Sequence, residues 1–186
     1  MRLLEPPTSY NTGTRLYVAS GNSVLSVFDI TTGIPLNGQN VPLPAGATFP
    51  SALAINPSGT RLYVSGEATD NVTVFDVSTG TPTAGQNVVQ PAGATRPRSL
   101  AINSAGTRLY TANRDTHNLT GFDITTGTPV SSQNVALPAN QFFPRSRLAL
   151  GNRLYVANGG SDTLTAFDIS TGMPANSVTL AYPPSP

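Results

Sequence analysis

The sequence Gly-Thr-Arg-Leu-Tyr at residues 13–17 decides the fold, because it returns at a fixed spacing along the chain. It recurs at residues 59–63 and 106–110 and, with Asn in place of Thr, at residues 151–155. Successive copies begin 45 to 47 residues apart. A fixed period of this length is typical of repeat architectures, in which each repeat is one supersecondary unit. The sequence of 186 residues therefore predicts four tandem units.

A second motif follows each copy of the first and reads Phe-Asp-(Ile/Val)-(Thr/Ser)-Thr-Gly. It stands at residues 28–33, 75–80, 122–127 and 167–172. The two motifs each occur four times, in the same order and 15 or 16 residues apart, which leaves little room for a chance repeat.

Each unit reads as four short strands separated by turns. In the second unit the β-rich runs are residues 51–55, 61–65, 72–77 and 86–90, and Gly, Pro, Asn and Ser cluster between them. No segment has a helical period. Four strands of about five residues with their turns fill one blade of a β-propeller.

The expected fold is all-β, a single propeller domain built from four antiparallel four-stranded blades of about 46 residues each. The expected blades are residues 1–48, 49–95, 96–142 and 143–182, followed by a Pro-rich tail at 183–186. The first blade carries Pro6 and Pro7 where the others have a first strand, and consecutive prolines cannot donate to a strand ladder. We therefore expect the first blade to lack a regular innermost strand.

Leu-Tyr-Val-(Ser/Ala), followed by a strand that ends in the second motif, resembles the YVTN-type β-propeller repeats over nearly the whole chain. Members of that family serve as binding and surface-layer modules and as scaffolds for unrelated activities. The resemblance therefore implies a propeller fold and a secreted or cell-surface location, without implying one reaction.

Four blades are fewer than the six to eight of most propellers that this repeat resembles. The chain could close as a four-bladed ring, form half of an eight-bladed ring completed by a homodimer, or be a piece of a longer protein. Because an open fan leaves apolar blade faces in water, some closure is expected, and we favour the homodimer.

Composition excludes several classes of function. Only 10% of residues are charged and the formal net charge is +1, which argues against a nucleic-acid partner. The chain has no Cys, so it has neither disulfides nor thiolate metal ligands. No signal peptide and no apolar run long enough to span a membrane occur in the sequence, so membrane insertion is not expected.

The Arg of the first motif and the Asp of the second should face each other across a hairpin in every blade. Such bidentate pairs would fix strand register. The alternative is a ring of four Asp side chains that acts as a metal or acid/base site. The structural interpretation is favoured because each Asp precedes a Thr-Gly turn whose amides it can bind. The expected pairs are Arg15 with Asp29, Arg61 with Asp76, Arg108 with Asp123, and Arg153 with Asp168.

The remaining charges are predicted to gather on one face, where the turns between second and third strands emerge beside the blade-to-blade connections. They are expected to be unpaired and to lie at the mouth of the central channel, where they could bind a small anion or a carboxylate. The alternative is that they are solvated loop residues. The candidate ligand-binding residues are Arg96, Arg98, Arg114, His117, Arg145 and Arg147.

These observations favour a non-enzymatic module that binds a protein or a surface structure. Catalysis has little support, because His117 is the single histidine and no nucleophile motif occurs. No catalytic residue, metal ligand or cofactor is predicted. The alternative function is a lactonase-like hydrolase, or another enzyme of small ligands, on a propeller scaffold.

Overall fold

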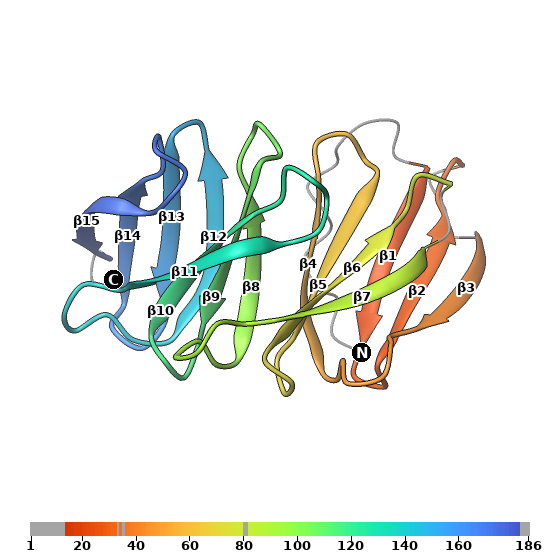
Figure 1. The fold of residues 1–186 in the computed structure, drawn as a ribbon, viewed down its shortest axis with the longest axis horizontal. Helices are drawn as coiled ribbons and strands as arrows, with labels where there is room; N and C mark the ends of the chain where they lie inside the picture. Colours follow the sequence, from red (N-terminus) through yellow and green to blue (C-terminus); the bar gives the residue numbers. More distant parts are fainter. Residues whose placement is uncertain (1–13, 33, 35, 80–81, 183–186) are drawn as a thin grey trace.

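The computed structural model describes residues 14–32, 34, 36–79 and 82–182. These residues form fifteen β-strands and no helix (Figure 1). None of the described segments is therefore a helix with the length and apolar character needed to cross a membrane. The strands are β1 (Arg15–Ser20), β2 (Val24–Asp29), β3 (Leu36–Pro42), β4 (Pro50–Ile55), β5 (Arg61–Gly66), β6 (Asn71–Asp76), β7 (Thr83–Val89), β8 (Pro97–Ile102), β9 (Arg108–Asn113), β10 (Asn118–Asp123), β11 (Val130–Ala136), β12 (Pro144–Leu150), β13 (Arg153–Asn158), β14 (Thr163–Asp168) and β15 (Ala175–Ala181).

Consecutive strands pair antiparallel and make separate sheets, which are the blades of a propeller. Blades 2, 3 and 4 are the four-stranded sheets β4–β7, β8–β11 and β12–β15, and blade 1 contains β1, β2 and β3. The strands predicted within the second unit are confirmed, with ends that differ by a few residues. The prediction that blade 1 lacks a regular innermost strand concerns residues outside the described part of the chain.

The hydrophobic core lies between the blades, in three clusters, because each sheet presents apolar side chains on both faces. Tyr17 and Leu25 of blade 1 pack against Phe75 of blade 2 in the first cluster. Blade 2 packs against blade 3 in the second cluster, and blade 3 against blade 4 in the third. Each middle blade therefore depends on two neighbours to bury its faces.

The repeated Tyr links neighbouring blades by a hydrogen bond. The hydroxyl of Tyr63 in blade 2 donates to the carbonyl of Gly127 in blade 3 over 2.9 Å. Tyr110 in blade 3 donates in the same way to Gly172 in blade 4, also over 2.9 Å. The Tyr of the first motif and the Gly of the second thus form one inter-blade contact.

The first strands of the four-stranded sheets lie at the inner edges of the blades. β8 contacts both β4 and β12, and the Ser51 hydroxyl in β4 donates to the Pro97 carbonyl in β8 over 2.9 Å. Figure 1 places β2 and β3 at one end of the molecule and β14 and β15 at the other. The described residues therefore form an open fan of four blades and not a closed four-bladed ring.

Candidate functional site

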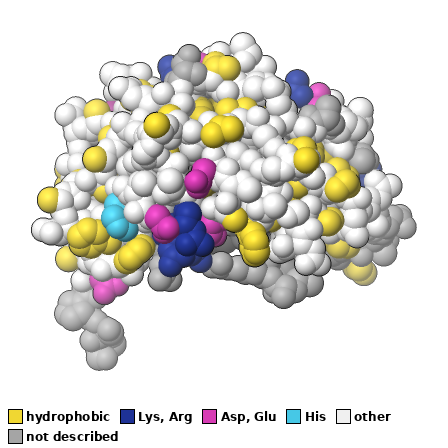
Figure 2. Space-filling view, turned by 60° about the horizontal axis from the view of Figure 1, so that its bottom comes forward, with side chains coloured by type: hydrophobic (Ala, Val, Ile, Leu, Met, Phe, Trp, Pro, Cys, Tyr) yellow, Lys and Arg dark blue, Asp and Glu magenta, His cyan; other side chains and the backbone are white. Residues whose placement is uncertain are grey.

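Three arginines converge on one carboxylate where blades 2 and 3 meet. Glu67 lies in the turn after β5, Arg96 in the connection before β8, Arg98 in β8, and Arg114 in the turn after β9. Their guanidinium nitrogens lie 3.7, 3.8 and 3.7 Å from Glu67 Oε1. Figure 2 shows a central group of basic side chains with acidic side chains beside it. We call Glu67, Arg96, Arg98, Arg114 and Asp115 the arginine cluster.

Asp115 completes the arginine cluster on its exposed side. One of its oxygens lies 3.5 Å from Arg96 Nη1 and the other 4.0 Å from Arg114 Nε. The three arginines and two carboxylates carry a formal charge of +1. Because the contacts to Glu67 are longer than hydrogen bonds, they leave donor capacity on the guanidinium groups of Arg96 and Arg114 for a further anion.

The backbone at Arg96 is held in an unusual conformation. Its φ is 56°, a left-handed value that non-glycine residues seldom adopt. The equivalent residues Phe49 and Phe143, which also precede a proline at a blade entrance, have φ values of 50° and 52°. The Asp70 carboxylate accepts a 2.6 Å hydrogen bond from the Arg96 amide, which helps to hold this conformation. Because the same conformation occurs at three blade entrances, it is a feature of the repeat that positions whichever side chain stands there.

An aromatic group borders the arginine cluster. The His117 ring makes edge-on contacts with the Phe142 and Phe143 rings, at centroid distances of 5.3 and 5.1 Å. The Arg114 guanidinium carbon lies 5.8 Å from the centre of the Phe143 ring. Figure 2 shows the histidine beside hydrophobic side chains that reach the surface. An anion with an apolar portion could therefore contact the guanidinium groups with its charge and the aromatic rings with its apolar part.

His117 is oriented by the backbone. Its Nδ1 accepts a 3.3 Å hydrogen bond from the Phe143 amide. A neutral imidazole that accepts at Nδ1 carries its proton on Nε2, so the outer nitrogen is a donor.

The structure brings together Arg96, Arg98, Arg114 and His117 of the six predicted ligand-binding residues. Arg145 and Arg147 lie in β12, and their side chains are outside what the structure describes. The prediction that these charges are unpaired was wrong for the arginine cluster, because long side chains from adjacent turns reach one another. Sequence reasoning also missed Phe142 and Phe143, although Phe143-Pro144 occupies the repeat position of Arg96-Pro97.

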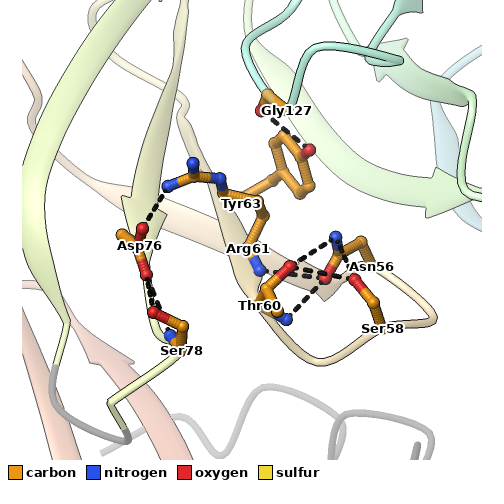
Figure 3. Close-up of polar contacts among 8 residues, drawn as sticks. All are labelled: Asn56, Ser58, Thr60, Arg61, Tyr63, Asp76, Ser78 and Gly127. Atoms are coloured by element: carbon orange, nitrogen blue, oxygen red, sulfur yellow. Dashed lines mark hydrogen bonds and ion pairs between the residues drawn. The ribbon is translucent and has the colours of Figure 1, made fainter.

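The four Asp residues of the second motif have the structural role that the sequence favoured. Asp76 lies opposite Arg61 and accepts a 2.7 Å hydrogen bond from its Nη1 (Figure 3). Its other oxygen accepts from the amide and hydroxyl of Ser78, at 2.9 and 2.5 Å. One oxygen therefore serves the strand pair and the other the turn, so the predicted bidentate geometry was wrong.

The same arrangement recurs in the other blades. The Oδ2 atoms of Asp29 and Asp123 lie 3.6 and 3.5 Å from the Nη1 atoms of Arg15 and Arg108. Asp168 lies opposite Arg153 in the pairing of β13 with β14. Hydrogen bonds from the following Thr or Ser are the main cause that lowers the pKa of these four carboxyl groups, and the facing Arg lowers it further. Within the described residues, no group of three or more His, Cys, Asp or Glu side chains is placed to hold a metal ion.

Comparisons with known proteins agree with this architecture. The sequence model of the family described as lactonase, 7-bladed β-propeller, matches residues 11–143, which is well over half of the chain. No curated protein sequence matches.

A putative 6-phosphogluconolactonase from Bacteroides fragilis is similar in structure, with a TM-score of 0.76 and 18% identity over 97% of this chain and 55% of its own. A protein of unknown function from Desulfotomaculum acetoxidans gives a TM-score of 0.73 and 14% identity, over 90% of this chain and 53% of its own. Hydrazine synthase from Kuenenia stuttgartiensis gives a TM-score of 0.68 and 18% identity, over 97% of this chain and 51% of its own.

The chain spans about half the length of these three solved structures, and at such identities they show the fold alone. The YVTN resemblance is thereby supported at the level of the β-propeller fold. The match of the family model over more than half of the sequence goes further: this chain belongs to the lactonase family of seven-bladed β-propellers.

Proposed function

We propose that the chain is the propeller of a lactonase-like hydrolase, and that the arginine cluster binds a small lactone bearing a phosphate or carboxylate group. The observation that carries the proposal is the convergence of Arg96, Arg98 and Arg114 on one carboxylate beside exposed aromatic rings. Family membership supplies the class of reaction. A structurally similar protein named as a putative 6-phosphogluconolactonase suggests the class of substrate.

The reaction itself adds water across the ring ester. The water oxygen forms a bond to the carbonyl carbon, the ring C–O bond breaks, and the products are a carboxylic acid, which ionises, and an alcohol that takes up a proton. Positive charge stabilises the negative oxygen that develops during the attack. Arg96 and Arg114, which are the more exposed arginines of the cluster, are the candidates for this role.

Asp115 is the candidate group for orienting the water. Its side chain is 44% exposed, whereas that of Glu67 is 16% exposed and is surrounded by the three arginines. The neutral His117 presents a donor on Nε2, which suits binding of a substrate oxygen better than removal of a proton from water.

The test is the rate at which purified protein opens 6-phosphogluconolactone, measured as acid release above the spontaneous rate, with unphosphorylated gluconolactone as the comparison substrate. The proposal predicts faster hydrolysis of the phosphorylated lactone. Arg96→Ala should lower kcat/KM about tenfold or more, because a hydrogen bond to a charged group contributes about 1.5–3 kcal/mol. Asp115→Asn should lower kcat and leave phosphate binding intact.

Arg15→Ala is the matched control, because it removes the same charge from the ion pair that Arg15 forms with Asp29 in blade 1, outside the arginine cluster. It should leave both kinetic constants unchanged. No acceleration over water with either lactone, together with no binding of inorganic phosphate, would contradict the proposal.

A non-enzymatic binding module is the second candidate. Its support is the exposure of Phe142 and of Phe143, which lies beside Arg114, because aromatic residues and Arg are enriched at the centres of protein interfaces. Binding of phosphate at the arginine cluster without hydrolysis of any lactone would favour this candidate.

A further inference from the structure

Three blade entrances carry a row of exposed side chains on one face of the fan. Phe49, Arg96 and Phe143 immediately precede the prolines that begin β4, β8 and β12. Neighbouring members stand 47 residues apart in the sequence, and all three share the left-handed backbone conformation described above. We call these three residues the entrance row. Each entrance joins two blades that the structure describes, so the entrance row lies inside the fan and not at its ends.

The order of the entrance row in space follows from the inner strands. β8 contacts both β4 and β12, and Figure 1 shows it between them. Arg96 therefore lies between the two phenylalanines. The same backbone hydrogen bond anchors each member: its carbonyl accepts from the amide that follows the second strand of its blade, at 3.0, 3.0 and 3.1 Å, from Glu67, Arg114 and Gly159. The repeat thus fixes the backbone of the entrance row, and only the side chains differ.

The entrance row places a guanidinium group between two aromatic rings. Phe49 and Phe143 are 63% and 41% exposed, and the side chain of Arg96 is 46% exposed. Figure 2 shows hydrophobic side chains on both sides of the central basic group. Aromatic residues and Arg are the types enriched at the centres of protein interfaces. The entrance row therefore has the composition of a binding surface that extends over three blades.

We propose that the entrance row binds an extended peptide segment in which an acidic residue has one apolar residue two positions before it and another two positions after it. The acidic side chain pairs with Arg96, and the apolar side chains cover the two rings. Alternate side chains of an extended chain face the same side at intervals of about 6.6 Å. The Cα atoms of β8 come within 8 Å of those of β4 and of β12, so the blades are spaced on the same scale.

Charge and extent both favour a peptide of this kind. The arginine cluster carries a formal charge of +1, and Arg96 and Arg114 are its more exposed arginines. A small lactone covers one entrance, whereas the two rings of the entrance row lie on both sides of the positive charge. The inference rests on the anion-binding part of the proposed function and not on hydrolysis. A bound segment would exclude a lactone from the arginine cluster and so act as a competitive inhibitor.

The experiment is a calorimetric titration of the 186-residue protein at low salt with the end-blocked peptide Gly-Leu-Ser-Glu-Ser-Leu-Gly, which we call the probe. One control peptide has Gln in place of Glu. The other, Gly-Ser-Leu-Glu-Leu-Ser-Gly, turns both leucines to the opposite side of the extended chain from the acid. The probe should bind about tenfold more tightly than either control, because each control lacks the charged pair or the apolar contacts. Equal affinities of the three peptides, or no binding of the probe at millimolar concentration, would overturn the proposal.

Phe49→Asn and Phe143→Asn test the two aromatic positions, because Asn tolerates a left-handed backbone, as Asn140 does here with a φ of 65°. Each should weaken binding of the probe several-fold, and Arg96→Asn should abolish it. Phe49 is the more exposed ring, so Phe49→Asn decides the matter if Phe143→Asn fails to fold. Wild-type affinity in Phe49→Asn would overturn the proposal.

Ile34→Ala is the matched control for these variants. Ile34 is 65% exposed and follows β2, at the opposite end of the strands from the blade entrances. The Ile34→Ala protein should therefore bind the probe as tightly as wild type. An equal loss of affinity in Ile34→Ala and Phe49→Asn would show that the probe does not recognise the entrance row.

Inorganic phosphate separates this inference from the proposed function. Phosphate should weaken binding of the probe, because both anions use Arg96. Binding of the probe that phosphate does not weaken would place the peptide elsewhere and overturn the inference. Phosphate binding and lactone hydrolysis without binding of the probe would overturn this inference alone. Binding of the probe that phosphate weakens, in a protein that opens neither lactone, would support the inference and contradict only the hydrolytic part of the proposed function.

Discussion

Asp76 and Asn56 show how one repeated polar residue can support two neighbouring segments at once. Asp76 joins β6 to β5 through Arg61 and also holds the turn through Ser78. Asn56 does the same before β5, where its side-chain oxygen accepts from the amides of Thr60 and Arg61 at 2.9 Å each. Changing either residue would leave both a strand pair and a turn unsupported.

Asp76→Ala should therefore lower the melting temperature, and Asp76→Asn should lower it less, because an amide oxygen can still accept from the Ser78 amide.

The lowered pKa of Asp76 also predicts that the stability of the protein depends on pH. The Asp76 carboxyl group binds its proton more tightly in the unfolded chain than in the folded protein. The stabilisation by the ionised carboxylate is therefore present above pH about 4 and is lost as the pH falls through the folded pKa. Thermal unfolding of both variants and the wild type at pH 7 and pH 3 measures both effects. Equal melting temperatures of Asp76→Ala and wild type at pH 7 would refute the stabilising role of Asp76.

Gly127 offers a second prediction at the residue scale. Its φ is +85°, and a Cβ there would lie 2.9 Å from Arg61 Nε of the neighbouring blade. Gly127→Ala should cost at least about 1 kcal/mol of the free energy of unfolding, through backbone strain and displacement of Arg61. Gly21→Ala is the control, because nothing lies within 4 Å of the added Cβ. Urea unfolding of both variants measures the difference, and equal midpoints would show that the site accommodates a methyl group.

At the scale of strands and blades, the sequence was sufficient to predict nearly every element. The strands of blade 2 follow from runs of Val, Leu and Ile between turn residues, and the Arg61–Asp76 register follows from counting around the hairpin. The inter-blade hydrogen bonds could not be predicted, because Tyr63 and Gly127 lie in different repeats and only packing brings them together.

Tyr63→Phe should destabilise the fold by about 1 kcal/mol, because it removes a hydrogen bond and leaves the Gly127 carbonyl without its partner. Tyr182→Phe, at an exposed tyrosine, is the control and should have no effect. The free energy of unfolding from urea titration at pH 7 provides the measurement. Equal stability of Tyr63→Phe and wild type would mean that the bond contributes nothing.

The same tyrosines predict a loss of stability in alkali. Burial raises the pKa of Tyr63 and Tyr110 to about 12. The unfolded chain loses these protons near pH 10, so their contribution is complete below that pH and disappears as pH rises toward 12. Melting temperatures between pH 8 and pH 12 should fall over this interval, and should fall less steeply in Tyr63→Phe. A parallel fall in both proteins would assign the effect to other groups.

At the scale of the whole molecule, repetition predicts the scaffold and the exceptions to repetition mark the candidate site. The sequence singled out Arg96, Arg114 and His117 because they lie outside the four repeated Arg–Asp pairs and fall in connections and turns expected on one face. Their partners could not be predicted, because Glu67 meets Arg96 and Arg114 only through the packing of blade 2 on blade 3. The open ends of the fan likewise follow from how the blades are rotated about one another, which the repeat does not specify.

The most direct test of the anion site is a calorimetric titration of wild type and Glu67→Gln with inorganic phosphate at low salt. Glu67 occupies the centre of the three guanidinium groups with its own negative charge. If the arginine cluster binds anions, Glu67→Gln should bind phosphate several-fold more tightly than wild type, and Arg96→Ala should abolish the gain. If neither wild type nor Glu67→Gln binds phosphate, and Glu67→Gln is only less stable, the arginine cluster is a structural ion network and the proposed site is wrong.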